Sequence, residues 1–162
     1  MEKTAAQLPE IKLVGITART NNAAEFNPAT AHIPNTIQQY FQKGLSEKIS
    51  HRKQPGTTYC AYTDYESDLN GDYTYFIGEE VDSFDNLPEG LTPLTIPAQT
   101  YTKFTNGPAP MPNVCIGLWQ KIWEMPSNEL GGTRSYRTDF ELYDERARDQ
   151  NSTVLDIYIG VL

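Results

Sequence analysis

The chain has 162 residues, enough for one domain with a hydrophobic core and few for two independent domains. Its formal net charge is −8 and it contains no run of lysine or arginine. This argues against direct nucleic-acid binding, because a phosphate backbone would be repelled. The sequence shows no signal peptide and no apolar stretch long enough to span a membrane, so we expect a cytoplasmic protein without membrane partners.

Tyrosine is the unusual feature of the composition, with 10 copies beside 6 Phe and 2 Trp. Tyrosine rings suit half-wet apolar surfaces such as a binding cleft, although tyrosine is also a good strand former. The negative charge would attract a cationic ligand, yet solubility alone is the simpler explanation of it. Cys60 and Cys115 stand apart, without a CxxC or His/Cys cluster, so we expect no metal, no cofactor and no disulfide framework.

The first half of the chain predicts the order strand, helix, strand, strand. Residues 11–20 are rich in β-branched residues and predict the first strand, and a polar turn follows. A helix is expected from Ile33 to about Ile49, because apolar residues recur there at helical spacing. Residues 57–64 and 73–81 predict two strands, and the segment between them contains Asn-Gly and suits a hairpin turn.

The second half predicts the same order after a connector rich in proline, glycine and acids. The predicted segments are the connector 82–97, a strand 99–105, a loop 106–112, a helix 114–123, a strand 136–146 and a strand 153–161. Each half therefore reads β-α-β-β. We predict an α+β fold in which one domain, residues 1–162, contains an internal repeat of approximately 9–82 and 94–162.

Short stretches at the ends of the halves support this duplication. Phe76-Ile77-Gly78 corresponds to Tyr158-Ile159-Gly160, and Cys60-Ala61-Tyr62 corresponds to Glu141-Leu142-Tyr143. Two such units would share one antiparallel sheet, with both helices on one face. We expect a ligand cleft where the halves meet, on the side of the sheet opposite the helices.

The strand 136–146 contains an acid among apolar and aromatic residues. Phe140 and Leu142 alternate with Asp139, Glu141 and Tyr143, so the two sets point to opposite faces. An ionised carboxylate that is partly removed from water needs a cation. From the spacing alone, an exposed or internally paired acid is the preferred interpretation of Glu141, with Arg137 or Arg146 as its partner.

Several segments resemble the GyrI-like effector-binding domains. They are Leu87-Pro88-Glu89-Gly90-Leu91, Ile96-Pro97-Ala98-Gln99-Thr100-Tyr101 with Phe104 and Gly107-Pro108, Leu118-Trp119-Gln120-Lys121-Ile122-Trp123, Asp139-Phe140-Glu141-Leu142-Tyr143-Asp144 and Leu155-Asp156-Ile157-Tyr158-Ile159. This family occurs as the ligand-sensing part of AraC-type and MerR-type multidrug regulators and as stand-alone proteins. The resemblance implies that a buried glutamate at position 141 pairs with lipophilic cations among aromatic rings. Unlike the regulators, this chain shows no helix-turn-helix or winged-helix segment, and Asp156 stands where the family commonly has a longer acid.

The resemblance favours Glu141 as the anionic anchor of a pocket. If the apolar residues of the last two strands pack under the helices, Tyr143 and Tyr158 face the cleft with Glu141, and Phe76 is the weaker repeat partner of Tyr158. Trp119 either closes one side of the cleft or packs in the core, whereas core packing is preferred for Trp123.

These residues lead to three hypotheses for the function. The first is a small-molecule binding protein for lipophilic, cationic aromatic compounds, acting as a sensor or by sequestration. The second is a small hydrolase with Glu141 as general base, for which the sequence supplies no second catalytic group. The third is a protein that inhibits a topoisomerase partner, as the family name implies.

Overall fold

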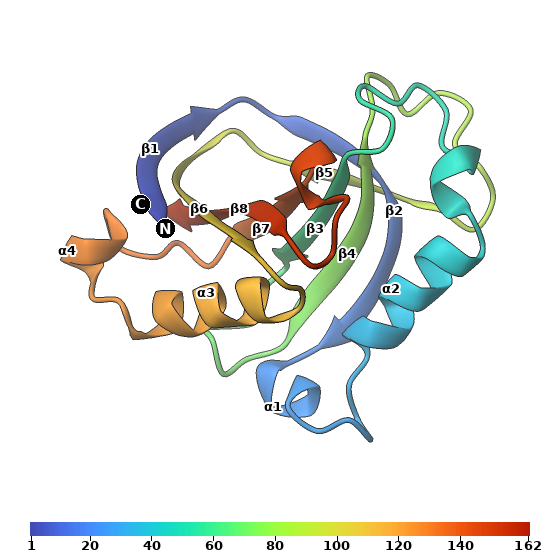
Figure 1. The fold of residues 1–162 in the computed structure, drawn as a ribbon. Coiled ribbons are helices and arrows are strands. Elements are labelled where there is room, and N and C mark those ends of the chain that lie inside the picture. The colour runs from blue at the N-terminus through green and yellow to red at the C-terminus, as the bar shows by residue number, and fades with distance from the viewer.

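A computed structural model describes every residue from Met1 to Leu162. The chain forms one eight-stranded sheet with helices packed against it (Figure 1). The elements are β1 (Glu2–Leu8), β2 (Ile11–Thr20), α1 (Asn22–Glu25), α2 (Ile33–Gln42), the 3₁₀ turn η1 (Leu45–Lys48), β3 (Thr58–Thr63), β4 (Tyr73–Glu80), β5 (Thr92–Ile96), β6 (Gln99–Ala109), α3 (Asn113–Glu124), α4 (Ser127–Leu130), β7 (Thr138–Tyr143), the 3₁₀ turn η2 (Glu145–Ala147) and β8 (Thr153–Val161).

All neighbouring strands run antiparallel, in the order β1-β6-β8-β7-β3-β4-β2-β5. The predicted α+β class and antiparallel sheet are therefore confirmed. The order is symmetrical about the β3–β7 pair, where Cys60 lies directly opposite Glu141. A duplicated unit would produce this symmetry, and the repeat of 9–82 and 94–162 remains our interpretation of it.

The two outermost strands are exchanged between the halves. β1, which precedes the first half, pairs with the second half, and β5, which precedes the second half, pairs with the first. β1 leads into β2 through Pro9 and Glu10 but pairs with β6, and β5 leads into β6 through Pro97 and Ala98 but pairs with β2. In Figure 1 β1 and β2 form one arc that passes over the rest of the sheet. The two short links therefore join the opposite ends of the sheet.

Neither outermost strand was predicted from the sequence. β1 lacks the β-branched and aromatic alternation of an ordinary strand, and most of its side chains are exposed. β5 contains Pro93, which cannot donate to a ladder and is tolerated because β5 is an edge strand. The α2 helix also ends earlier than predicted, since Gly44 adopts a left-handed conformation with a φ of 58° just beyond it.

Both faces of the sheet are buried. The inner face encloses a cluster to which all eight strands contribute, and the helix face carries α2 on the first half and α3 on the second. Tyr40 of α2 packs against Tyr73 and Tyr75, and α3 packs against Leu155, Ile157 and Ile159. The prediction that both helices share one face is confirmed.

β2 and β4 approach each other closely where Gly15 faces Gly78. A Cβ atom on Gly15 would lie 1.9 Å from the Ile77 carbonyl oxygen, and one on Gly78 would lie 2.1 Å from that of Val14. No side chain fits at such distances. The two glycines therefore permit the close approach of β2 and β4.

The predicted assignment of residues to faces was right for β8, where Leu155, Ile157 and Ile159 pack under α3, and wrong for β7. Glu141 pairs in register with Ile157 and therefore lies on the helix face, whereas Tyr158 pairs with Phe140 and stacks on its ring at 4.5 Å in the inner cluster. Phe76 lies in that inner cluster as well. Alternation along one strand shows which residues share a face, but with both faces buried it does not show which face that is.

Candidate functional site

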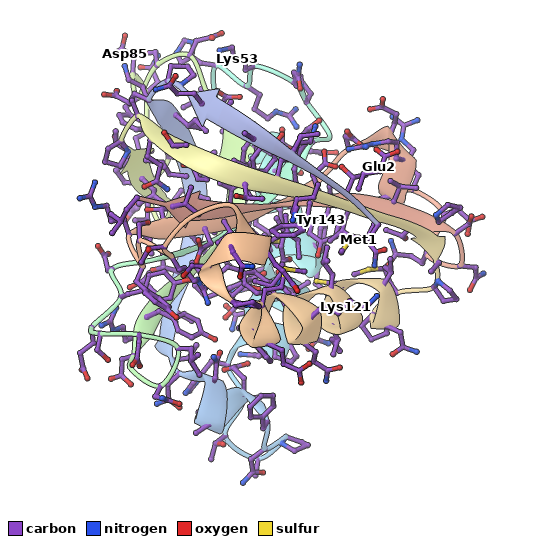
Figure 2. All side chains as sticks on the ribbon, turned by 90° about the vertical axis from the view of Figure 1, so that its left-hand side faces the viewer. Met1, Glu2, Lys53, Asp85, Lys121 and Tyr143 are labelled. Carbon is purple, nitrogen blue, oxygen red and sulfur yellow. The ribbon has the colours of Figure 1, made fainter.

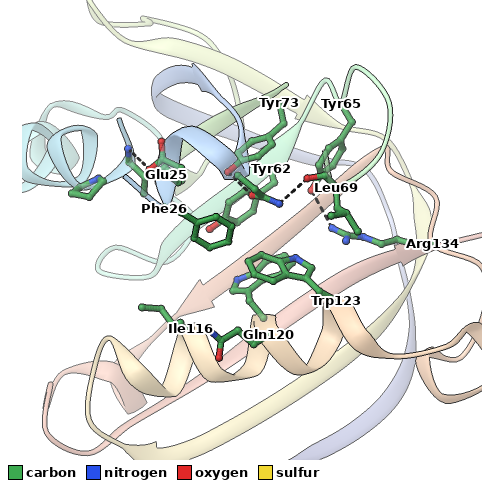
Figure 3. Close-up of a pocket in the computed structure, with 14 residues that line it drawn as sticks. Glu25, Phe26, Tyr62, Tyr65, Leu69, Tyr73, Ile116, Gln120, Trp123 and Arg134 are labelled. Carbon is green, nitrogen blue, oxygen red and sulfur yellow. Dashed lines mark hydrogen bonds between the residues drawn. The ribbon is translucent and has the colours of Figure 1, made fainter. Parts of the chain in front are cut away.

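A cavity of about 360 Å³ opens on the helix face between the two halves (Figure 3). This position corrects the prediction of a cleft on the side opposite the helices, although its location between the halves agrees. Most of its lining side chains are apolar or aromatic: Asn22, Glu25, Phe26, Ile33, Pro34, Tyr62, Tyr65, Leu69, Tyr73, Ile116, Trp119, Gln120, Trp123 and Arg134. Its size and lining are typical of small-molecule sites.

One wall comes from α3, whose cavity-lining residues repeat at helical spacing. Ile116, Trp119, Gln120 and Trp123 occupy a single stripe of the helix, three or four residues apart. The neighbouring stripe, which includes Leu118 and Ile122, packs on the sheet. The α3 helix thus contributes side chains both to the core and to the cavity. Trp123 lines the cavity, whereas the sequence favoured core packing for it.

The opposite wall comes from α1 and the start of α2. The Asn21 side chain accepts a hydrogen bond from the Ala24 backbone N–H at 2.8 Å and caps α1. Glu25 accepts from the Thr20 hydroxyl at 2.5 Å and from the backbone N–H groups of His32 and Ile33 at 2.8 and 3.1 Å. Its carboxylate therefore caps the amino end of α2 beside the cavity, with no cationic side chain paired to it.

Phe26 lies at the mouth of the cavity. Its ring is largely exposed and meets Trp123 of the opposite wall edge-on, with 6.0 Å between the ring centres. Figure 3 shows Phe26 between the α1 wall and α3. The α1 segment and α3 thus approach each other through these two rings.

Glu141 lies directly behind the cavity rather than in its lining. It is 4 % exposed, and its carboxylate accepts hydrogen bonds from the Tyr62 hydroxyl at 2.6 Å, the Trp119 indole N–H at 2.7 Å and the Tyr143 hydroxyl at 2.6 Å. All three donors are neutral, and no cation pairs with Glu141. The hydrogen bonds offset the desolvation of the carboxylate, but its charge remains uncompensated.

Two of these donors separate Glu141 from the cavity. Tyr62 and Trp119 line the cavity with their rings, which meet edge-on with 5.1 Å between their centres, while their polar ends point back to the carboxylate. Tyr143 completes the set from behind and lies between the sheet and α3 in Figure 2, whereas Lys121 lies on the outside of α3. The two rings thus line the cavity while their polar edges contact a buried negative charge.

A second acid, Asp139, is wholly buried beside the cavity. Its Oδ1 atom accepts the Gly160 backbone N–H at 2.8 Å, and its Oδ2 atom accepts from the Tyr65 hydroxyl at 2.6 Å and from Arg134 Nη2 at 2.7 Å. Asp139 and Arg134 form an ion pair that is formally neutral. The carboxylates of Glu25 and Glu141 therefore leave the surroundings of the cavity net negative.

Burial raises the pKa values of the site tyrosines. The phenol pKa values of Tyr62, Tyr65 and Tyr143 are raised well above the ordinary value, first because burial disfavours the phenolate and then because a carboxylate lies beside each hydroxyl. Burial also raises the pKa of Tyr101, on the inner face, to about 12.

These shifts predict alkaline unfolding. An unfolded tyrosine loses its proton near pH 10, whereas the buried tyrosines of the folded protein keep theirs. The free energy of unfolding is therefore unaffected by these tyrosines below about pH 10 and falls as the pH rises towards 12. Each such tyrosine removes up to about 1.4 kcal/mol per pH unit in that range. We expect tyrosinate absorbance at 295 nm to appear together with loss of the far-ultraviolet circular dichroism signal. Gradual ionisation with the dichroism signal intact would contradict this.

The structure brings together three of the five predicted site residues. Glu141, Tyr143 and Trp119 form one hydrogen-bonded group, whereas Tyr158 and Phe76 lie across the sheet in the inner cluster and do not reach the cavity. Sequence reasoning missed the cavity residues Glu25, Phe26, Tyr62, Tyr65 and Arg134. Only Tyr62 carried a usable signal, since it is the repeat counterpart of Tyr143.

Other features of the chain stay outside the cavity. Cys60 and Cys115 are both buried and free. No helix combines the length and the apolar character needed to cross a lipid bilayer.

Comparison with known proteins places the chain among effector-binding proteins. Residues 5–161 match the Cass2 family, described as integron-associated effector binding protein. YobU of Bacillus subtilis, described as a transcriptional regulator, is 27 % identical over 150 residues that span 93 % of this chain and 91 % of YobU. The transcriptional regulator BrlR of Pseudomonas aeruginosa is 33 % identical over 135 residues, and the match spans 78 % of this chain but only 47 % of BrlR.

Solved structures share the fold. The integron cassette protein VCH_CASS2 from Vibrio cholerae superposes with a TM-score of 0.78 at 28 % identity, over 99 % of this chain and 95 % of that one. SAV2435, solved bound to tetraphenylphosphonium, superposes with a TM-score of 0.77 at 20 % identity, over 100 % of this chain and 94 % of that one. The match over nearly the whole chain, together with this fold, shows that the protein belongs to the family of integron-associated effector binding proteins.

Proposed function

We propose that this protein binds lipophilic, cationic aromatic compounds in the cavity between α1 and α3. The observation that carries the proposal is the buried carboxylate of Glu141, which has no cationic partner and lies immediately behind two lining rings, Tyr62 and Trp119. A cation on those ring faces would be attracted by the rings and by the charge behind them.

The physical chemistry of the site favours large, delocalised cations. A cation on an aromatic face gains about 0.5–2 kcal/mol, with the larger values where water is excluded. A lipophilic cation loses little hydration on entering, whereas a small inorganic ion would lose its whole shell and find no oxygen ligand in the ring faces. Neutral aromatics would gain only the apolar contact. The site would thus select by charge and by shape together.

The comparisons support this proposal in two ways. The family is one of effector-binding proteins, and SAV2435, which shares the fold, was solved with tetraphenylphosphonium, itself a lipophilic aromatic cation. Relatives named as transcriptional regulators suggest a sensor role, but this chain spans about half of BrlR. We propose ligand binding as the activity of this chain, in a sensing or sequestering role.

Nothing in the site favours hydrolysis over binding. The Glu141 oxygens already accept hydrogen bonds from Tyr62, Tyr143 and Trp119, so neither oxygen faces the cavity as a free base. We therefore propose that Glu141 acts as a fixed charge and not as a general base.

Two ions of the same shape and opposite charge test the proposal. We expect tetraphenylphosphonium to quench or shift the tryptophan fluorescence, because Trp119 and Trp123 line the cavity, and we expect no response to tetraphenylborate. Glu141→Gln should lower the affinity for tetraphenylphosphonium at least about tenfold, equivalent to about 1.4 kcal/mol, through loss of the buried charge. The neutral triphenylphosphine oxide should bind both forms equally.

The matched control is Glu145→Gln, the same substitution at an exposed position four residues along the chain. It should leave the affinities for tetraphenylphosphonium and triphenylphosphine oxide unchanged, and circular dichroism should confirm that both variants are folded. If Glu141→Gln bound tetraphenylphosphonium as tightly as the parent protein, the anchoring role of Glu141 would be wrong. If the parent protein bound neither cation nor neutral probe, the proposed function itself would fail.

A further inference from the structure

Arg134 is the one cationic side chain that lines the cavity, in a site whose other charges are negative. It lies two residues after the glycine pair Gly131-Gly132, and its side chain is 10 % exposed. A cation in this position is unexpected for a site that attracts cations. Its contacts show which part of it is engaged and which part is free.

The guanidinium group is held in place on several sides. Its Nη2 atom donates to Asp139 Oδ2 at 2.7 Å and to the Tyr65 hydroxyl at 3.4 Å. Its central carbon lies 4.5 Å from the ring centre of Tyr136 and 5.8 Å from that of Trp119. Tyr136 has a φ of 52°, a left-handed conformation that is rare for a bulky residue and that places its ring against the guanidinium. Arg134 is thus part of a rigid arrangement.

Part of the hydrogen-bonding capacity of Arg134 is unused. Both of its hydrogen bonds come from Nη2, and the buried Nε atom has no acceptor in the protein. Nη1 likewise makes no hydrogen bond within the protein. Guanidinium N–H groups are strong donors, and a buried donor without a partner is rare in folded proteins because it is costly. In Figure 3 the guanidinium end of Arg134 points towards the cavity beside Tyr65 and Leu69.

We propose that the free N–H groups of Arg134 form a subsite for a hydrogen-bond acceptor of the ligand. The preferred ligands are then aromatic cations that also carry a carboxylate or another strong hydrogen-bond acceptor. This inference rests on the proposed function and narrows its ligand class. The cationic part would lie on Trp119 and Tyr62 in front of Glu141, and the acceptor would face the free N–H groups of Arg134. Asp139 neutralises the arginine, which lets a guanidinium remain buried there beside the cavity.

Two phosphonium ions that differ in a single group test the subsite. Pentyltriphenylphosphonium and 4-carboxybutyltriphenylphosphonium share the aromatic cation and the chain length, and only the second ends in a carboxylate. Isothermal titration calorimetry at neutral pH should show that Arg134→Met weakens binding of the carboxylate compound at least about tenfold, as expected for a lost charge-assisted hydrogen bond. Binding of the pentyl compound should change by less than about threefold.

Two further variants guard against an effect on folding. Arg134→Met leaves Asp139 buried without its partner, so Arg134→Gln is also combined with Asp139→Asn, which replaces the ion pair by two neutral amides. The double variant should show the same selective loss. Arg137→Met removes an equal charge from a nearby exposed position and should leave both affinities unchanged. Thermal melting establishes that each variant is folded.

The outcomes separate this inference from the function on which it rests. Equal losses for both compounds, or no loss for either, would overturn the subsite while the binding function stands. Tighter binding of the pentyl compound by Arg134→Met would also overturn it, because Arg134 would then be a competitor of the ligand cation. Failure of the parent protein to bind either phosphonium would remove both the subsite and the proposed function.

Discussion

Replacing Asp139 by alanine is expected to lower the free energy of unfolding by about 3–5 kcal/mol, a large part of the stability of an ordinary domain. The substitution removes the partner of a buried arginine and three hydrogen-bond acceptor contacts at once, those to Gly160, Tyr65 and Arg134. The uncompensated charge of the largely buried Arg134 side chain accounts for most of the expected loss. Urea denaturation followed by circular dichroism measures it.

Two controls isolate the buried charge in this experiment. Asp139→Asn keeps an acceptor for the Gly160 N–H and should cost less than alanine. Lys53→Ala breaks the ion pair with Glu80, in which Lys53 is 55 % exposed, and should cost no more than about 1 kcal/mol. A loss for Asp139→Ala as small as that for Lys53→Ala would show that Arg134 reaches water when its partner is removed.

Gly78→Ala is the second substitution with a large expected effect. A methyl group at this position would lie 2.1 Å from the Val14 carbonyl oxygen and 2.8 Å from the Gly15 Cα atom, both of them backbone atoms of the paired strand. Backbone in the middle of a buried sheet cannot move aside as a flexible side chain would. We expect a loss of at least about 3 kcal/mol, at the upper end of the range for overpacking.

The same substitution at Gly117 provides the matched control. Gly117 lies inside α3, and a Cβ atom there would meet no other atom within 4 Å. Gly117→Ala should therefore raise the free energy of unfolding by about 0.5–1 kcal/mol, because alanine restricts the unfolded chain and favours helix. Opposite signs for the two variants would show that backbone contact between strands sets the cost. Stabilisation by Gly78→Ala would contradict the approach of β2 and β4 described above.

The regular elements of the fold could be predicted because their own sequences determine them. The stripes of α2 and α3 and the β-branched strands predicted these two helices, six of the eight strands and the repeated β-α-β-β order along the chain, whereas the short helices α1 and α4 were expected to be a turn and a loop. The edge strands β1 and β5 could not be predicted in this way. β1 is a strand because it pairs with backbone N–H and C=O groups of β6 that would otherwise lack partners. β5 contains a proline that only an edge position tolerates.

The candidate site was predictable where it rests on a single strand and unpredictable where it depends on packing. Glu141 and Tyr143 are two residues apart on β7, so alternation places them together. Glu141 was placed on the wrong face because its pairing with Ile157 depends on the register between β7 and β8, which is a property of two strands. Tyr158 missed the site because the cavity opens on the helix face. Glu25 and Arg134 come from a short helix and a glycine-containing loop, and only the folded chain brings them to the cavity.

The exchanged edge strands also determine how a ligand can enter. A hinge motion that spread the halves apart would have to break the six paired positions between β3 and β7, and the links Pro9–Glu10 and Pro97–Ala98 would still tether the far ends of the sheet. The pairing across the sheet therefore opposes such a motion. Entry past the α1 wall, where Phe26 and Trp123 meet edge to edge, would leave every strand pairing intact.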